Sequence, residues 1–262
     1  LERESLDGAE VYRMIEETGM PLSFHAGYHW DDPSLKTVNR FLGMHALGFA
    51  WPNIVHCTNW VLNGMPARFP KLKVIWIESG LAWVPFLMQR LDDQFLMRPS
   101  EAPHLKRLPS EYMRDHCWYT TQPMETTNRK ALECTLDMIK ADTQLLYASD
   151  WPHFDFDLPS EITDLPFLSE QSKRNILGLN AARIFNLDPP PVKQRERQQS
   201  LERVAGDADL VGLERFRPAV RAVERRRHVR ERLAVPRNHA AHVETRDHVE
   251  RVARGRQRVD HF

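Results

Sequence analysis

The chain has 262 residues, of which 42% are hydrophobic, and its 36 basic side chains balance its 36 acidic ones. This composition predicts a globular protein with a core of its own, and the zero net charge excludes a general attraction to nucleic acid or anionic membranes. No apolar run approaches the roughly 18 residues of a membrane span, and the first residues lack the apolar core of a signal peptide. Three widely spaced cysteines without a CxxC pair argue against a disulfide framework, so we expect a cytoplasmic protein.

The first predicted elements are a helix and a short buried strand. Apolar residues recur at helical spacing from Leu6 to Glu17, and Gly19 is a typical helix stop. The run Pro21 to Ala26 is largely apolar, carries His25 near its end and is closed by Gly27. It predicts a buried strand that ends beside an imidazole.

Further helices and strands alternate along the chain. The helical segments cover residues 35–49, 52–68, 83–96, 126–140 and 168–187, and the strands cover 72–77, 117–121 and 144–150. Glu78 follows the second strand and Asp150 ends the last one. A lone buried carboxylate is costly unless it is paired or bound to a metal, so both side chains need partners.

This alternation predicts parallel strands covered by helices, with their carboxyl ends at one edge. The sequence has neither GxGxxG nor GxxxxGK[ST], which argues against a nucleotide-binding sheet and favours an α/β (β/α)₈ barrel. Four predicted strands make half of such a barrel. Its open edges would favour association, so a homo-oligomer is expected.

His25, Glu78 and Asp150 should therefore meet at one edge of the sheet. Imidazole and carboxylate groups together suit a divalent ion such as Zn²⁺, which activates water and polarises substrate oxygens. Taken singly, His25 would more often be a core histidine and Asp150 a helix cap or turn residue. Their joint placement favours the metal site.

Three motifs, in this order, resemble one family: WIESGLAWVPFLMQRLD, YASDWPHFD and NILGLNAARIFNL. They are similar to the amidohydrolase-related proteins that include aminocarboxymuconate semialdehyde decarboxylase and the resorcylate-type decarboxylases. The resemblance runs from about Leu6 to Leu187. It implies a metal-dependent barrel in which a histidine on strand five and an aspartate on strand eight bind zinc or manganese, and His25 and Asp150 match these positions.

The sequence departs from the family pattern in two places. Members carry an HxH or ExH pair on the first strand, and this sequence starts too late to contain it, so the resemblance implies the C-terminal half of a barrel. His25 and His29 do not replace that pair, because Gly27 ends the strand. Characterised decarboxylases have a catalytic histidine after strand six, where this chain has Glu78.

The leading hypothesis is a metal-dependent hydrolase of the amidohydrolase superfamily that acts on a small carboxylated, aromatic-derived compound. Glu78 and Asp150 are the predicted catalytic residues, and His25 and Asp150 are the predicted ligands of zinc or, as the alternative, manganese. The predicted substrate contacts are His29, Trp151 and His153. Two alternatives stay open: a decarboxylase of the aminocarboxymuconate semialdehyde type, and a truncated, inactive derivative.

The domain boundary is predicted near residue 188. Residues 1–188 form the barrel domain, whereas 189–262 are rich in arginine, alanine and valine, with Lys193 as their one lysine. Acidic residues are interleaved with the arginines, so nucleic-acid binding is the weaker hypothesis. The tail is predicted to be an irregular or loosely helical extension, or the product of a shifted reading frame, which we favour.

Overall fold

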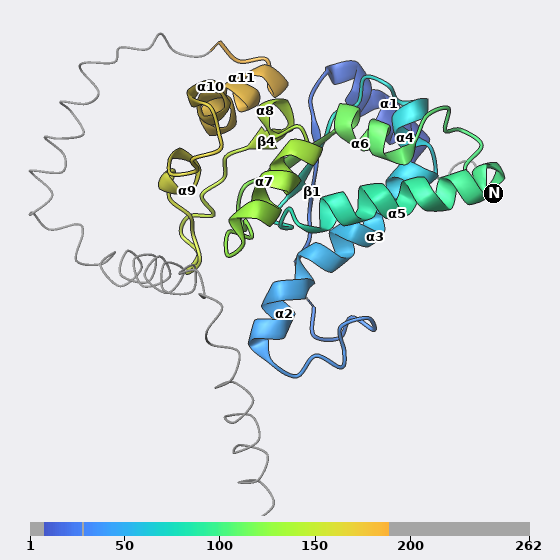
Figure 1. The fold of residues 1–262 in the computed structure, drawn as a ribbon. Coiled ribbons are helices and arrows are strands. Elements are labelled where there is room, and N and C mark those ends of the chain that lie inside the picture. The colour runs from blue at the N-terminus through green and yellow to red at the C-terminus, as the bar shows by residue number, and fades with distance from the viewer. Residues whose placement is uncertain (1–7, 28, 189–262) are drawn as a thin grey trace, which may run out of the picture. The chain divides into compact units, whose positions relative to one another are not determined.

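The computed structural model describes residues 8–27 and 29–188, and the predicted tail 189–262 lies outside the described residues. A 4-stranded parallel sheet with the order β1-β2-β3-β4 forms its centre. The strands are β1 Leu22–His25, β2 Val74–Ile77, β3 Cys117–Thr120 and β4 Leu145–Leu146. The predicted parallel sheet with alternating helices is confirmed (Figure 1).

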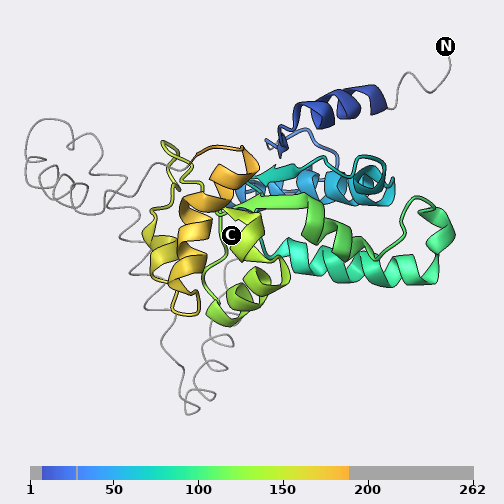
Figure 2. The same ribbon diagram turned by 90° about the horizontal axis from the view of Figure 1, so that it is seen from above.

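Helices connect the strands and surround the sheet, as the view from above shows (Figure 2). They are α1 Ala9–Thr18, α2 Phe41–Gly48, α3 Ala50–Leu62, α4 Met65–Arg68, α5 Trp83–Met97, η2 Pro99–Glu101, α6 Pro109–His116, α7 Arg129–Met138, α8 Ala141–Gln144, α9 Ser160–Thr163, α10 Glu170–Arg174, the π-helical turn η3 Asn175–Leu179 and α11 Asn180–Ile184. Within residues 8–27 and 29–188, every helix is too short or too polar to cross a bilayer.

Glycine and asparagine set several helix ends. Gly19 ends α1 with φ 70°, as the sequence predicts. Gly64, with φ 69°, divides the predicted helix 52–68 into α3 and α4. The predicted start of the helix 126–140 was wrong: α7 begins after Asn128, whose Oδ1 accepts a hydrogen bond from the Ala131 N–H at 3.2 Å.

The last strand is shorter than the predicted range 144–150. Beyond β4, the Tyr147 N–H donates to the Ile176 carbonyl at 2.9 Å. The Ala148 N–H donates to Thr121 Oγ1 at 3.0 Å. Because these amides bond to a helix and a side chain, the ladder with β3 stops and the chain is free to turn toward Asp150.

The core lies between the sheet and helices α3, α5 and α6. Trp76 and Tyr119 are fully buried in it. The helices contribute Trp60, Val61, Leu87, Met88 and Met113. His56 packs against Phe24 and Trp76, with ring centroids 4.1 and 5.7 Å away, and burial lowers its pKa. Each large apolar side chain removed from water contributes about 1.5–3 kcal/mol, so these residues stabilise the packing of the helices on the sheet.

The carboxyl ends of the strands lie on the same side as α2. In Figure 1, β1 runs from the side of α1 toward the lower end of α3, next to α2. His25 at the end of β1 is paired in register with Ile77 at the end of β2. Side chains that follow each strand are therefore brought together at this edge.

Candidate metal centre and active site

Glu78 and Asp150 occupy the same rare backbone conformation. Their φ values are 52° and 58°, in the left-handed region that few residues other than glycine, asparagine and aspartate adopt. The Glu78 N–H donates to Thr120 Oγ1 on the next strand at 3.0 Å. Such conformations cost about 1–3 kcal/mol and persist where the surroundings impose them, often at functional sites.

The turn after Glu78 is held by a carboxylate from the loop after β3. Glu125 Oε2 accepts hydrogen bonds from the Leu81 N–H at 3.0 Å and the Ala82 N–H at 3.1 Å, at the start of α5. Gly80, with φ 73°, lies so close that a side-chain Cβ would collide with the Glu125 carboxylate. Glu125 therefore holds the first turn of α5, and with it the segment that presents Glu78.

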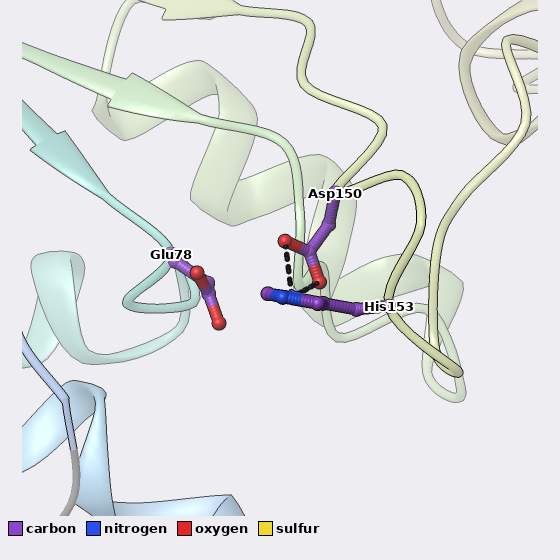
Figure 3. Close-up of side chains that lie close together, drawn as sticks. All are labelled: Glu78, Asp150 and His153. Atoms are coloured by element: carbon purple, nitrogen blue, oxygen red, sulfur yellow. Dashed lines mark hydrogen bonds and ion pairs between the residues drawn. The ribbon is translucent and has the colours of Figure 1, made fainter.

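Glu78, Asp150 and His153 converge on one space (Figure 3), and one donor atom of each lies within 4.8 Å of the others. His153 Nδ1 lies 2.9 Å from Asp150 Oδ1 and 3.0 Å from Oδ2. On the other side, His25 Nε2 lies 2.7 Å from Glu78 Oε2. Both carboxylate side chains are only 12% exposed, whereas the His25 and His153 side chains are 50% and 63% exposed.

The charges of the four side chains are coupled. Burial raises the pKa of Glu78, and the nearby Asp150 carboxylate raises it further, whereas the hydrogen bond and charge of His25 oppose the rise. The hydrogen bond to Asp150 and its negative charge raise the pKa of His153. The carboxylates thus repel each other across the space, which a cation between them would relieve.

This donor set fits a divalent cation of the zinc or manganese type, which accepts both imidazole nitrogen and carboxylate oxygen. The arrangement differs in detail from the predicted pair of ligands, His25 and Asp150. In the structure, His25 is hydrogen-bonded to Glu78, while His153 is the histidine that contacts Asp150. The sequence predicts His153 as a substrate contact, and its spacing of three from Asp150 is also a signal for a shared site.

Two predicted substrate contacts lie outside this cluster. Trp151 is 48% exposed, and its ring packs edge-on against Phe156 with centroids 4.9 Å apart. His29 lies on an exposed turn, where its carbonyl accepts a hydrogen bond from the Asp32 N–H at 3.1 Å. Their roles in substrate binding stay predictions.

Sequence reasoning missed a second group of side chains beside the cluster. His45 Nε2, on α2, lies 3.5 Å from Asp155 Oδ2, in the loop after β4. The residues are 110 positions apart by their numbers, and no local spacing connects them. The only signal was the density of aromatic residues around each of them.

The sheet and its polar edge define an α/β protein of the barrel type with a candidate cation site at the carboxyl ends of its strands. The sequence profile of the Amidohydrolase family matches residues 2–187, and the chain belongs to this family. The resemblance noted from the three motifs and the barrel-type fold are confirmed.

The relatives include decarboxylases of aromatic acids. Gamma-resorcylate decarboxylase from Rhizobium sp. is 27% identical over 142 residues, which cover 53% of this chain and 42% of that protein. The structure of 5-carboxyvanillate decarboxylase from Sphingomonas paucimobilis is 26% identical with a TM-score of 0.54, covering 68% of this chain and 52% of that one. The chain thus spans about half the length of these relatives.

A third relative carries a metal. The structure of dihydroxybenzoic acid decarboxylase from Polaromonas sp. contains manganese and the inhibitor 2-nitroresorcinol. It is 22% identical, with a TM-score of 0.53, and the match covers 68% of this chain and 53% of that one. This likeness shows a shared fold.

Proposed function

We propose that the protein is a metal-dependent carboxy-lyase that removes CO₂ from a small aromatic carboxylate. The observation that carries the proposal is the convergence of Glu78, Asp150 and His153 at the carboxyl edge of the sheet. The similarity to gamma-resorcylate and 5-carboxyvanillate decarboxylases supports decarboxylation more strongly than hydrolysis, the leading hypothesis from the sequence.

Asp150 and His153, with His25 as predicted from the sequence, would hold the metal. Their oxygen and nitrogen donors suit both zinc and manganese. When bound, the cation supplies a positive charge that binds carboxylate and phenolic oxygens and stabilises negative charge as it develops. Asp150 belongs both to the ligand pair predicted from the sequence and to the group of donor atoms that converge in the structure. It is therefore the decisive residue for metal binding.

Glu78 is the proposed proton donor. When the bond between the ring and the carboxylate breaks, CO₂ leaves and the bonding electron pair stays on the ring carbon, which must then receive a proton. Glu78 Oε2 lies 2.7 Å from Nε2 of His25, a proposed metal ligand, so the proposed proton donor lies directly beside the metal site.

Hydrolysis is the second candidate. The observation that favours it is Glu78 itself, which stands where the family resemblance places the catalytic histidine of decarboxylases. A buried carboxylate beside a cation could remove a proton from an attacking water instead of donating one to carbon. Release of CO₂ and cleavage of an ester, lactone or amide are separate readouts, so one substrate panel distinguishes the two reactions.

The first test measures metal in the purified chain by inductively coupled plasma mass spectrometry, after incubation with Zn²⁺ or Mn²⁺. We expect one metal per chain, and Asp150→Asn and His25→Ala should weaken binding at least about tenfold. Glu101→Gln is the control, because Glu101 pairs with Arg98 on the exposed η2 segment. Equal binding by wild type and Asp150→Asn would reject the site.

The second test follows CO₂ release from 2,6-dihydroxybenzoate and 5-carboxyvanillate. These two compounds appear in the names of similar decarboxylases whose structures are known. The metal-loaded chain should release CO₂ from at least one aromatic carboxylate, and Glu78→Gln should abolish release while it retains the metal. Cleavage of an ester or lactone without CO₂ release would support hydrolysis instead. A chain that binds no metal would support the inactive derivative.

A further inference from the structure

Four rings lie together beside the proposed metal centre. The His45 ring centroid lies 5.4 Å from that of Phe41, 5.7 Å from Phe49 and 5.2 Å from Phe154. Phe41 and Phe154 are themselves 6.3 Å apart. We call this group the aromatic cluster. Phe41 and His45 belong to α2 and Phe154 to the loop after β4, so the cluster joins two segments that are far apart in sequence.

The aromatic cluster is connected to the metal centre in space through Phe49 and along the chain through Phe154. The Phe49 ring meets the His25 ring edge-on, with centroids 6.3 Å apart. Phe154 directly follows His153, whose imidazole contacts Asp150. These two connections place the aromatic cluster next to the proposed metal centre.

A polar link holds the aromatic cluster in place. Asp155 Oδ2 lies 3.5 Å from His45 Nε2. From the buried side, Gln122 Nε2 donates to the Asp155 carbonyl and to Asp155 Oδ2, both at 3.3 Å. Gln122 is only 2% exposed, so it supports Asp155 from the protein interior. Asp155 thus connects the loop after β3 to α2 and fixes the backbone next to Phe154.

The rings that this link supports remain open to solvent. Phe154 is 63% exposed and Phe41 is 47% exposed. Ring pairs prefer offset or edge-to-face contacts with centroids about 4.5–7 Å apart, which is the spacing within the aromatic cluster. Another aromatic ring could add to it with the same geometry.

We propose that Phe41 and Phe154 form a subsite that binds the ring of an aromatic carboxylate, while His45, Asp155 and Gln122 position it. This inference rests on the proposed function and adds the residues that recognise the ring. Phe154 contacts the substrate ring, whereas His45 acts through Phe154. The subsite selects aromatic acids over saturated acids that carry the same oxygen donors.

The test compares two ligands of the metal-loaded full chain by isothermal titration calorimetry. One is 2,6-dihydroxybenzoate, and the other is 2-hydroxycyclohexanecarboxylate, which keeps a carboxylate and a neighbouring hydroxyl on a saturated ring. We expect Phe154→Leu to weaken binding of the aromatic ligand roughly three- to tenfold and to leave the saturated ligand and the metal content unchanged.

Three further variants complete the design. Phe154→Tyr keeps the ring and should bind 2,6-dihydroxybenzoate as wild type does. His45→Gln should lower the preference for the aromatic ligand without loss of metal. Phe86→Leu is the matched control, because Phe86 is an exposed phenylalanine on α5, outside the aromatic cluster, and should change neither affinity.

The outcomes separate the two proposals. If wild type binds 2,6-dihydroxybenzoate only with metal, and Phe154→Leu binds it equally well, the subsite is rejected and the proposed function stands. Equal weakening of both ligands by Phe154→Leu also rejects ring recognition. If metal-loaded wild type does not bind 2,6-dihydroxybenzoate, the proposed function falls and the subsite with it.

Discussion

At the scale of single residues, the site depends on a main-chain conformation that the surroundings impose. Glu78 adopts φ 52° without the glycine or asparagine that usually occupies this region. The Glu78 N–H donates a hydrogen bond to Thr120 Oγ1 at 3.0 Å. The Thr120 hydroxyl in turn donates to the Gln122 carbonyl at 3.4 Å. Thr120 is therefore a buried bridge that orients the Glu78 backbone and the start of the next loop.

Replacement of Thr120 by valine should test this bridge. Thr120→Val keeps the shape but leaves the Glu78 N–H without its acceptor, so we expect a loss of about 1–2 kcal/mol in the free energy of unfolding. Thr120→Ser keeps the hydroxyl that accepts from the Glu78 N–H and should avoid most of that loss. Urea unfolding measures both, and equal stability of the valine and serine variants would show that the hydrogen bond is unimportant.

The sequence predicts part of the site because its residues follow strands. His25, Glu78 and Asp150 each lie at or just beyond the end of an apolar run, and parallel strands bring such residues to one edge. The structure brings Asp150 to this edge from a turn beyond β4 instead of from the strand itself. The link between His45 and Asp155 could not be predicted, because it depends on how α2 packs against a distant loop.

At the scale of elements, the carboxyl edge is held by contacts between neighbouring loops. Glu125, from the loop after β3, accepts two N–H groups at the start of α5, where the positive end of the helix dipole favours a carboxylate. Gly80 allows the Glu125 carboxylate to lie close to the backbone because it lacks a Cβ and readily adopts φ 73°. The position of the segment after β2 thus depends on the loop after β3.

Gly80→Ala should disturb this junction. The new Cβ would meet the Glu125 carboxylate, and alanine would be strained at this positive φ. We therefore expect a loss of about 1–3 kcal/mol in the free energy of unfolding. Gly27→Ala is the matched control, since its Cβ would meet nothing within 4 Å, and we expect a change within about 0.5 kcal/mol. Thermal unfolding compares them, and a similar effect of both substitutions would contradict the role of Gly80.

Element boundaries were harder to predict than element types. The periodicity predicts one helix over 52–68, but Gly64 adopts a left-handed conformation against His104 and divides it. The predicted strand 144–150 shortens to β4 because Thr121 Oγ1 and the Ile176 carbonyl take the next two amides. In both cases tertiary partners, which local spacing does not show, compete with the regular hydrogen-bond pattern.

At the scale of the whole described unit, one partly buried titratable group, His116, lies at the opposite end of the strands from the proposed metal centre. His116 directly precedes β3 at the amino end of the sheet, whereas Thr120 at the other end supports Glu78. Burial lowers the pKa of His116, and Arg107 contributes in the same direction, although the Leu72 backbone and the carboxylates of Asp115 and Glu16 oppose the shift. The folded chain therefore favours neutral His116.

This shift predicts a pH dependence of stability that is independent of the metal centre. Because the pKa of His116 is lowered on folding, its contribution is fully present above the ordinary value of 6.5 and is lost as pH falls below it, when the unfolded chain binds the extra proton. The slope stays below the limit of about 1.4 kcal/mol per pH unit for one proton. His116→Gln should flatten the profile of urea midpoints between about pH 8 and pH 5. Parallel profiles for wild type and variant would assign the acid sensitivity to other groups.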